Sequence, residues 1–525
     1  MAVAAYRHGW LIASTLVALL VAGPLLALPA SFIGEGDAFG EIATSLLPEA
    51  LLASIVLGVG VAAGTLVVGG GLALLVSFYD FPGRRWLDWA LVLPLAVPAY
   101  VLVFVLLGQY DEASPLQRAV RSLFGVSLPD VRTTMGAITV LTLVLYPYVY
   151  MLGRSAFLGQ SRQSLEAART LGLTYGRAVL RVALPLARPA LGAGVALAVM
   201  EALADFGAVN LLGYRALTDA IYRVWYGTFD QAAALQLATV LVGLALTLVS
   251  LERLLRGRAR YNQALGRGDA VIPRPLHGPA RWAAAVLPTA LLAVVFLLPV
   301  VQLIVWAAEA FADGASGTAL ARATINSLLL ASVAAVIAVI AATVVAYGAR
   351  AHPGRGTGIA VRVSSLGYAI PGTVAAVAVY VPLAWVDRQL PGLLLTGTAV
   401  GLVLAYVVRF HALAVLSVEA RMGRIDASLD EAARGLGASR ARLLTDVHVP
   451  LLVPGVATAG LLVFVEVLKE LPATALLRPL GGDTLSIAVW EATKESRFDV
   501  AALPALLIIL AGLVPVVVAI RLSRG

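Results

Sequence analysis

Four carboxylates stand in long apolar runs, where they form two matching pairs. Glu201 precedes Asp205 by four residues, and Glu466 precedes Glu470 by the same interval. Residues at this spacing share one face of a helix, so each pair presents two acids on the same side. Because hard cations prefer oxygen ligands, the four acids predict a translocation path for a cation. The alternative is structural: Lys469 can pair with Glu466, and acids near the outer ends of the spans can lie in water.

A second pattern lies upstream of each pair of acids. The segment Glu166-Ala-Ala-Arg-Thr-Leu-Gly172 matches Glu431-Ala-Ala-Arg-Gly-Leu-Gly437 with six identities in seven, at an offset of 265 residues. The same offset relates the two pairs of acids and the prolines that follow the segments: Pro185 with Pro450, and Pro189 with Pro454. We therefore interpret the chain as two copies of one unit, each with a charged loop.

The repeated segments are predicted to form short helices. In the second copy, Ser428 and Glu431 have the spacing of a capping box, in which each side chain accepts from a backbone N–H of the other residue. Glu166 and Glu431 are expected in the first helical turn, where the helix dipole favours a carboxylate. Gly172 and Gly437 suit the C-termini of these helices or a close packing contact. The alanines at 167, 168, 432 and 433 keep one side of each helix small. Pro185 and Pro450 are expected to turn the chain into the next span.

The composition places these loops in an all-α polytopic membrane protein. Of the 525 residues, 60% are hydrophobic and 13% are charged, and the mean hydropathy is +0.91. These values exclude a cytosolic enzyme, a disordered chain and a fibrous protein. The absence of cysteine excludes disulfides, thiolate metal sites and cysteine nucleophiles. Since a spanning helix needs about 20 apolar residues, the apolar runs predict twelve spans. These lie near 10–30, 50–77, 88–108, 134–153, 190–209, 233–252, 283–307, 325–347, 363–385, 393–416, 453–469 and 503–520.

The arginines predict the orientation of these spans. With the N-terminus in the cytoplasm, 26 of the 38 basic residues fall in cytoplasmic segments, 11 in outer segments and one, Arg409, inside a span. This bias favours twelve spans with both termini cytoplasmic. We divide the chain into a first transmembrane half, 1–252, a cytoplasmic linker, 253–282, and a second transmembrane half, 283–525. An even number of spans per half makes the two copies parallel in the membrane. The first span could be a cleavable signal peptide, but its length favours a retained helix.

The repeated loop resembles the EAA loop of the inner-membrane permeases of binding-protein-dependent ABC importers. That pattern is Glu-Ala-Ala, then glycine six positions after the glutamate, then a Leu/Ile-Pro pair. Here the pairs are Leu184-Pro185 and Val449-Pro450, and Val449 is a mild departure. The resemblance implies the fold of a type I ABC importer, in which each loop forms a coupling helix on a cytoplasmic ATPase dimer. It assigns that coupling to Glu166, Ala167, Ala168, Gly172, Pro185, Glu431, Ala432, Ala433, Gly437 and Pro450.

The sequences around the acids resemble those of ferric iron permeases. They are Met200-Glu-Ala-Leu-Ala-Asp-Phe-Gly207 and Val465-Glu-Val-Leu-Lys-Glu-Leu-Pro-Ala-Thr474. The resemblance implies import of ferric iron across a bacterial inner membrane, with a periplasmic or lipid-anchored ferric-binding protein outside. Related permeases carry thiamine, a polyamine or aminoethylphosphonate, and these substrates stay open.

Other motifs bear on the class of protein. Neither of the two lysines, Lys469 and Lys494, lies in a glycine-rich phosphate loop, so we expect no ATP hydrolysis by this chain. We therefore expect no enzyme, no bound cofactor and no stable metal site here, with ATP and Mg on a separate ATPase. A gradient-driven secondary transporter and a membrane scaffold are the alternatives from other classes. The duplicated loop argues against the former, which needs no ATPase dock. His411 lies inside a span near Arg409 and is a further candidate for the path.

Overall fold

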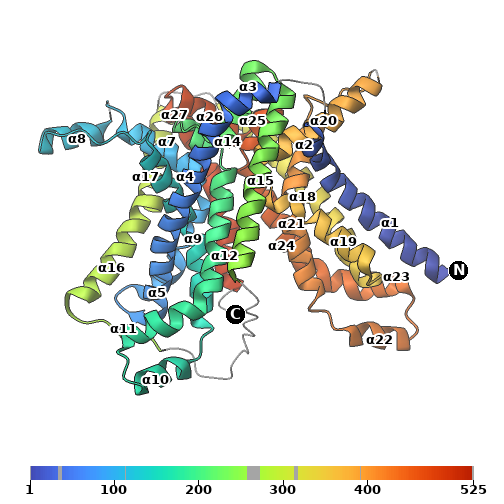
Figure 1. Cartoon of the computed structure of the whole chain (residues 1–525), viewed down its shortest axis with the longest axis horizontal. Coiled ribbons are helices and arrows are strands. Elements are labelled where there is room, and N and C mark those ends of the chain that lie inside the picture. The colour runs from blue at the N-terminus through green and yellow to red at the C-terminus, as the bar shows by residue number, and fades with distance from the viewer. Residues whose placement is uncertain are drawn as a thin grey trace. The chain divides into compact units, whose positions relative to one another are not determined.

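The computed structural model describes residues 2–33, 38–112, 114–256, 272–312, 317–390 and 392–522. Within these ranges the chain is almost wholly helical, which confirms the predicted all-α membrane fold (Figure 1). The two short strands β1 (Tyr79–Asp80) and β2 (Arg274–Pro275) pair in parallel. Residues 257–271 of the predicted linker lie outside the described ranges.

The helices form two compact units, and neither unit is one continuous half of the sequence. Unit 1 comprises 1–41, 221–242 and 316–488, and unit 2 comprises 42–220, 243–315 and 489–525. The first helix of the sequence thus packs with most of the second half, while the first and last helices of the second half pack with unit 2. The division at 253–282 therefore describes the sequence repeat, and as a domain boundary it stays a prediction.

The elements of unit 1 centre on α18, α21 and α24. In chain order they are α1 (Ala2–Ala22), η1 (Gly23–Leu26), α2 (Ala27–Ala30), η5 (Val224–Thr228), α18 (Gly317–Ala351), α19 (Arg355–Ser364), η7 (Leu366–Ala369), α20 (Gly372–Gln389), α21 (Ala399–Met422), α22 (Ala427–Gly435), α23 (Arg440–Arg442), η8 (Leu443–His448), α24 (Val449–Leu468) and α25 (Pro472–Leu477). Four helices run from one unit into the other: α3 (Ala38–Ser45), α14 (Leu217–Arg223), α15 (Gln231–Arg256) and α26 (Leu485–Lys494).

The elements of unit 2 centre on α4, α9 and α12. In chain order they are α4 (Leu47–Thr65), η2 (Leu66–Gly70), α5 (Gly71–Phe78), β1, α6 (Arg84–Ala90), η3 (Leu93–Ala96), α7 (Ala99–Tyr110), α8 (Pro115–Phe124), α9 (Thr134–Leu158), α10 (Arg162–Thr170), α11 (Tyr175–Ala178), η4 (Val179–Ala183), α12 (Leu184–Ala204), α13 (Gly207–Leu211), β2, α16 (Gly278–Leu292), η6 (Ala293–Leu297), α17 (Leu298–Ala312) and α27 (Phe498–Leu522).

Ten helices in the described part of the chain are long and apolar enough to cross a membrane, or eleven if one bent pair counts as a span. They correspond to ten of the twelve predicted spans. The two exceptions are 88–108, which is the bent pair Arg84–Ala96 and Ala99–Tyr110, and 363–385, which is divided among α19, η7 and α20. The described residues therefore contain ten or eleven of the twelve predicted spans, and the segments 88–108 and 363–385 are broken.

Equivalent prolines divide both exceptional segments. Pro98 and Pro371 directly precede α7 and α20. The residues before them, Val97 and Ile370, have extended backbone with ψ of 112° and 122°. A proline ring clashes with a helical conformation of the preceding residue, so the helix must stop there and begin again. The two halves of the first bent pair meet at 88°.

Pro185 and Pro450 do not turn the chain, contrary to the prediction. Each lies in the first turn of a long helix, α12 or α24, which continues directly from a π-helical turn, η4 or η8. In a regular helix the proline ring would clash with the carbonyl four residues earlier. The wider π turn moves that carbonyl aside, so the helix runs through the proline.

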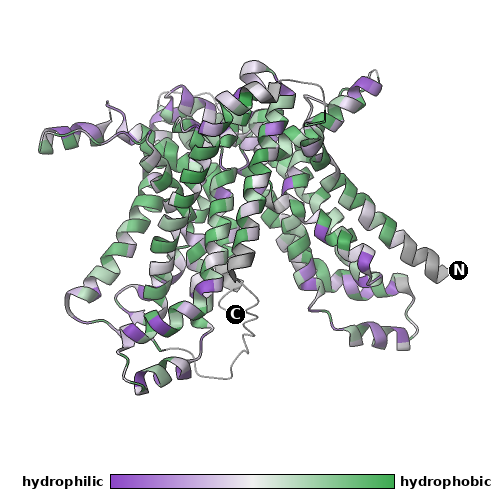
Figure 2. Cartoon of the chain, viewed as in Figure 1, coloured by the Kyte–Doolittle hydropathy of each residue, from purple (hydrophilic) through white to green (hydrophobic). Residues whose placement is uncertain are grey.

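Small residues allow the spans to approach closely within each unit. In unit 2, a Cβ on Gly194 of α12 would lie 2.7 Å from the Cα of Val149 on α9, so only glycine fits there. Aromatic packing joins other spans. In unit 1, Trp10 of α1 contacts Tyr347 of α18, with ring centroids 4.7 Å apart. Figure 2 shows that hydrophobic residues predominate along the long helices, while hydrophilic residues concentrate in the short helices α10 and α22.

Candidate functional site

The two repeated segments form the short helices α10 and α22, which we call the loop helices. Figure 1 shows α10 beyond the ends of α9 and α12 in unit 2, and α22 beyond the ends of α21 and α24 in unit 1. In each copy a short helix and a π turn lead from the loop helix into the next span. The loop helix is therefore continuous, through this connection, with one long helix of its own unit.

The start of each loop helix differs from the prediction. The N-cap of α22 is Asp426, whose Oδ1 accepts from the N–H of Ser428 at 2.9 Å, so Ser428 and Glu431 form no capping box. Aspartate is a strong N-cap, and here it lies two residues before the predicted serine. Glu166 and Glu431 therefore lie beyond the first turn, and the predicted dipole contact is wrong. Glu166 instead pairs with Arg162 one turn earlier on α10.

The end of each loop helix is as predicted. Gly172 and Gly437 have left-handed backbone with φ of +90° and +80°. In the first copy, the N–H of Leu173 donates to the carbonyl of Ala168, and the N–H of Gly172 donates to that of Arg169. The second copy repeats both hydrogen bonds at the same positions. This pair of bonds is a Schellman motif, which needs a left-handed residue and so favours glycine.

The exposed side chains of each loop helix form a similar surface in the two copies. Glu166, Ala167, Glu431 and Ala432 are exposed, while Ala168 is buried and Ala433 is partly buried. The leucine before each terminal glycine is largely exposed to solvent: Leu171 is 86% exposed and Leu436 is 89% exposed. Each copy thus displays a carboxylate, a small residue and an apolar side chain in a fixed arrangement, which suits docking of another protein.

At the other end of the spans, two of the four acids accept hydrogen bonds from backbone N–H groups. Asp205 Oδ1 accepts from the N–H groups of Ala208 and Val209 at 2.8 and 3.3 Å, at the start of α13. Glu470 Oε1 accepts from the N–H of Ala473 at 3.0 Å, at the start of α25. Both acids therefore satisfy donors that a helix N-terminus leaves without intrahelical partners.

Glu470 also forms an ion pair that no sequence pattern indicated. Its Oε1 accepts from Arg409 Nη1 at 2.9 Å, and its side chain is only 1% exposed. A Cβ on Gly372, the first residue of α20, would lie 2.2 Å from both partner atoms, so glycine there makes room for the pair. Arg409 and Glu470 are 61 residues apart, and the single signal was an isolated arginine inside a predicted span.

The other two acids, Glu201 and Glu466, are both partly buried. Glu466 on α24 pairs with Lys469, the C-cap of that helix, with Oε1 and Nζ 2.8 Å apart and both side chains partly exposed. Glu201 is partly buried on α12. The role of Glu201 and Glu466 in a path stays a prediction.

His411 is buried between α21 and α18 of unit 1. Its Nδ1 lies 3.3 Å from the carbonyl of Ala338, and its side chain has no exposed surface. Packing between helices accounts for this position. Among the described residues, no group of three or more His, Cys, Asp and Glu side chains is placed to hold a metal ion.

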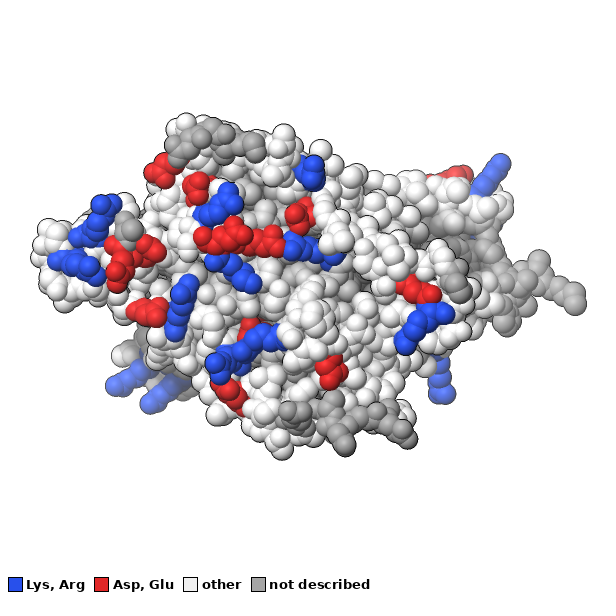
Figure 3. All heavy atoms as spheres, turned by 90° about the horizontal axis from the view of Figure 1, so that it is seen from above, with Lys and Arg blue, Asp and Glu red and all other residues white. Residues whose placement is uncertain are grey.

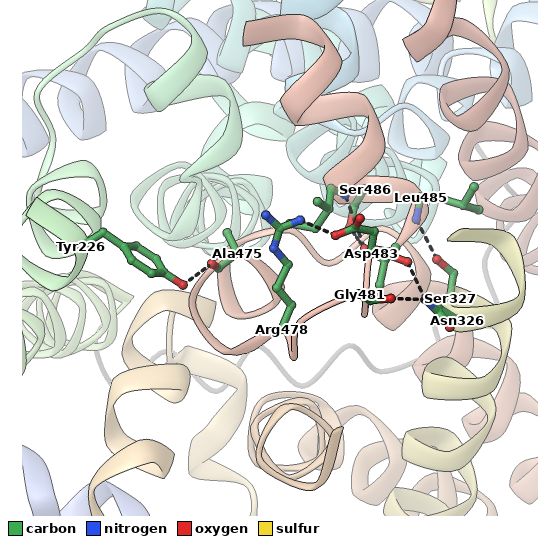
Figure 4. A network of polar contacts seen from close by, with 11 residues as sticks. Tyr226, Asn326, Ser327, Ala475, Arg478, Gly481, Asp483, Leu485 and Ser486 are labelled. Carbon is green, nitrogen blue, oxygen red and sulfur yellow. Dashed lines mark hydrogen bonds and ion pairs between the residues drawn. The ribbon is translucent and has the colours of Figure 1, made fainter. Parts of the chain in front are cut away.

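The loop between α25 and α26 is braced by a polar network in unit 1 (Figure 4). Arg478 pairs with Asp483 at 2.6 Å, and the side-chain amide of Asn326 donates to the carbonyl of Asp483 at 3.0 Å. The N–H of Leu485 donates to Ser327 Oγ at 2.8 Å.

On the face drawn in Figure 3, acidic and basic side chains are interspersed among the described residues.

Unit 2 contains an apolar groove of about 840 Å³ between α4, α12 and α15. Its walls include Gly58, Val195, Val199 and Leu248, and its single charged residue is Arg188. Its lining contains no acid. A cation inside this groove would therefore meet apolar walls and one positive charge.

Comparison with known proteins identifies the family. Two segments of the chain, 66–260 and 343–524, each match the model of the family described as "Binding-protein-dependent transport system inner membrane component", and together they cover well over half of the chain. The chain belongs to this family. It is thus the permease of an ABC importer, with two copies of the permease domain in one polypeptide.

Its relatives are named for several substrates. The permease is 27% identical over 517 residues to the Fe(3+)-transport system permease protein FbpB 2 of Haemophilus influenzae, an alignment that covers 96% of each chain. It is 33% identical over 236 residues to a probable molybdenum ABC transporter permease protein of Haloferax volcanii, covering 43% of this chain and 85% of the relative. A putative 2-aminoethylphosphonate transport system permease protein of Salmonella paratyphi A is 29% identical over 261 residues, covering 46% and 90%. The substrate is therefore not decided by family membership.

The two matched segments contain one loop helix each, so the permease carries α10 and α22 in equivalent positions. Sequence reasoning found both helices because their pattern is local. It missed Arg350 and His448, whose contacts to α22 depend on residues brought together by the fold, and it placed the N-cap at Ser428 where the structure has Asp426.

Proposed function

We propose that this permease imports ferric iron. Support comes from the relative named for Fe(3+) transport, which aligns over 96% of both chains and so shares the fused arrangement of two domains. The relatives named for molybdenum and aminoethylphosphonate align with less than half of this chain. The agreement over the full length is the single observation that carries the proposal.

A separate cytoplasmic ATPase, which works as a dimer, drives transport through the loop helices. The exposed Glu166, Ala167 and Leu171 on α10, and Glu431, Ala432 and Leu436 on α22, form two equivalent docking surfaces. Gly172 and Gly437 fix the end of each surface, and Pro185 and Pro450 lie where each connection enters a span. ATP and Mg bind to the ATPase, and this chain binds no cofactor. Closure of the ATPase then moves the two loop helices and rocks one half of the permease against the other.

The permease lies in a bacterial inner membrane with both termini in the cytoplasm. A periplasmic or lipid-anchored ferric-binding protein delivers iron to the ends of the spans away from α10 and α22. Iron is then the cargo of the permease and passes along a path to which Glu201 and Glu466 contribute carboxylates. Asp205 and Glu470 shape the outer ends of the same spans by holding α13 and α25.

An anionic substrate such as aminoethylphosphonate is the second candidate, and one observation favours it. The groove of unit 2 has Arg188 as its single charged residue and no acid in its lining. A guanidinium attracts an anion and repels a cation. Thiamine and polyamines lack this support, and a gradient-driven carrier would have no use for two docking surfaces.

Uptake of defined substrates tests the proposal. The permease and its ATPase are reconstituted in proteoliposomes with a binding protein loaded with ferric iron, molybdate or aminoethylphosphonate, and a hydrolysis-inactive ATPase is the matched control. We expect ATP-dependent accumulation of iron and of neither anion. Accumulation of aminoethylphosphonate without iron would replace the substrate and leave the importer class intact.

A further inference from the structure

The loop helix of the second half is held by a partly buried ionic contact. Asp430 on α22 accepts from Arg350 Nη2 at 2.9 Å and from His448 Nε2 at 2.8 Å, both through Oδ1. The side chains of Asp430, Arg350 and His448 are 14%, 17% and 2% exposed. Hydrogen bonds that involve charged groups in such a shielded position are directional and strong.

These three residues join α22 to several long helices of unit 1. Arg350 lies in the last turn of α18, and its Nη1 also donates to the carbonyls of Met422 and Ile425, where α21 ends. His448 lies in η8, directly before α24, and its ring packs edge-on against Tyr347 with centroids 5.5 Å apart. One carboxylate thus connects the loop helix to the ends of three spans.

The first half holds its loop helix differently. At the positions equivalent to Asp430 and His448 it has Leu165 and Ala183, which are 4% and 0% exposed. Leu165 and Ala168 belong to an apolar cluster that includes Tyr150 and Phe157. Apolar contact is non-directional, so it permits small displacements that a charge-assisted hydrogen bond resists.

We propose that Asp430 is a positioning residue, which makes α22 move as one body with α18, α21 and α24. The second half then transmits motion from the ATPase through an ionic link, whereas the first half transmits it through apolar packing. The functional part of this inference rests on the proposed coupling role of the loop helices. The mechanical part concerns contacts within unit 1 alone.

Distances between spin labels test the mechanical part. The natural chain has no cysteine, so two introduced cysteines carry the only labels. Gly435→Cys places one on α22, where a Cβ meets nothing within 4 Å and the first copy has Thr170. Leu416→Cys places the other on α21, where the leucine is 54% exposed. We expect a narrow distance distribution in the permease bound to its ATPase, and a clearly broader one after Asp430→Asn. Asp446→Asn removes an exposed acid from η8 and serves as the matched control, with an unchanged distribution.

The iron imported per ATP hydrolysed tests the functional part. Loss of a partly buried hydrogen bond between charged groups suggests a fall on the order of tenfold for Asp430→Asn, with ATP hydrolysis retained and partial recovery in Asp430→Glu. If Asp430→Asn fails to fold, His448→Phe removes one partner while keeping the ring beside Tyr347, and it should broaden the distribution by a smaller amount. An unchanged distribution and an unchanged ratio in these variants would overturn the proposal. Absence of iron uptake by the unmodified permease would count against the proposed substrate instead, because the label distances do not depend on it.

Discussion

Asp205 and Glu470, which the sequence repeat relates to each other, both hold the N-terminus of the short helix that follows. Asp205 accepts from the N–H of Ala208 at 2.8 Å, and Glu470 accepts from the equivalent N–H of Ala473 at 3.0 Å. Glu470 also forms an ion pair with Arg409, and its side chain is only 1% exposed. The two halves therefore use one capping arrangement, and in the second half the capping acid also forms an ion pair.

This difference predicts unequal effects on stability. Loss of an N-cap costs about 1 kcal/mol, which we expect for Asp205→Ala. Removal of one partner from a buried ion pair costs about 3–5 kcal/mol, which we expect for Glu470→Ala because this substitution breaks the pair with Arg409. Thermal unfolding in detergent measures both. Addition of Arg409→Met should recover part of the loss in Glu470→Ala, and equal losses in the two single variants would contradict the assigned ion pair.

Glu201 and Glu466 are the two acids expected to contribute to the path. Glu201→Gln combined with Glu466→Gln should reduce iron uptake and leave ATPase binding intact, because a carboxylate that lines the path stabilises a passing cation. The matched control is Glu49→Gln, which removes an exposed acid paired with Arg215. Uptake at the unmodified rate in the double variant would show that both acids are structural.

Glu166 and Glu431 are expected to contact the ATPase. The double variant Glu166→Ala, Glu431→Ala should weaken association with the ATPase or separate ATP hydrolysis from uptake, because both carboxylates are exposed on the proposed docking surfaces. Co-purification and the iron-to-ATP ratio measure the two effects. Glu495→Gln is the control, since this exposed acid pairs with Arg497 in unit 2. Normal uptake and normal association together would remove the coupling role.

Substitution of a terminal glycine by alanine should destabilise the loop helix more than the same substitution at a neighbouring glycine. Gly437→Ala forces a side chain into left-handed backbone, which costs about 1–2 kcal/mol, and the end of α22 should unwind. Gly435→Ala lies within α22, where a Cβ meets nothing, and should stabilise it slightly. Amide hydrogen exchange in α22 distinguishes the two variants. Equal exchange rates would contradict the Schellman motif.

The attachment of α22 should depend on pH only in strong acid. Burial alone would raise the pKa of Asp430, but the hydrogen bonds from Arg350 and His448 outweigh burial and hold this pKa below its usual value. The stabilisation is therefore complete above the usual aspartate pKa of about 4 and is lost as the pH falls through the lowered value.

Other charged or titratable groups near this contact are Tyr347 and Asp426. The pKa of Asp426 is lowered chiefly by the hydrogen bond from the N–H of Ser428. The label distance between α22 and α21 should stay narrow from pH 7 to pH 5 and broaden below about pH 4. In Asp430→Asn it should be broad throughout. A narrow distribution at pH 7 that broadens already at pH 6 would assign the contact to another group.

The parts of the fold that follow from local chemistry could be predicted from the sequence. Gly172 and Gly437 end their helices because left-handed backbone favours glycine, whatever surrounds them. The N-cap of α22 was predicted two residues too late because Asp426 and Ser428 are both good caps, and the chain uses the first. The division of the spans at Pro98 and Pro371 also has a local cause, but apolar composition hid it, since hydropathy does not register a break.

Contacts between distant segments could not be predicted. Arg409 and Glu470 are 61 residues apart in the sequence and meet because α21 and α25 pack together. Asp430 meets Arg350 across 80 residues for the same reason. The repeat suggested equal roles for α10 and α22, but Leu165 and Asp430 at one repeat position give the two helices different attachments.

The most direct test of the account is iron uptake by proteoliposomes that contain the permease, its ATPase and a ferric-loaded binding protein, with ion gradients collapsed by ionophores. The account predicts that iron accumulates with ATP, and that omission of either partner or of ATP abolishes uptake. Accumulation of iron driven by an imposed ion gradient in the absence of the ATPase would contradict it.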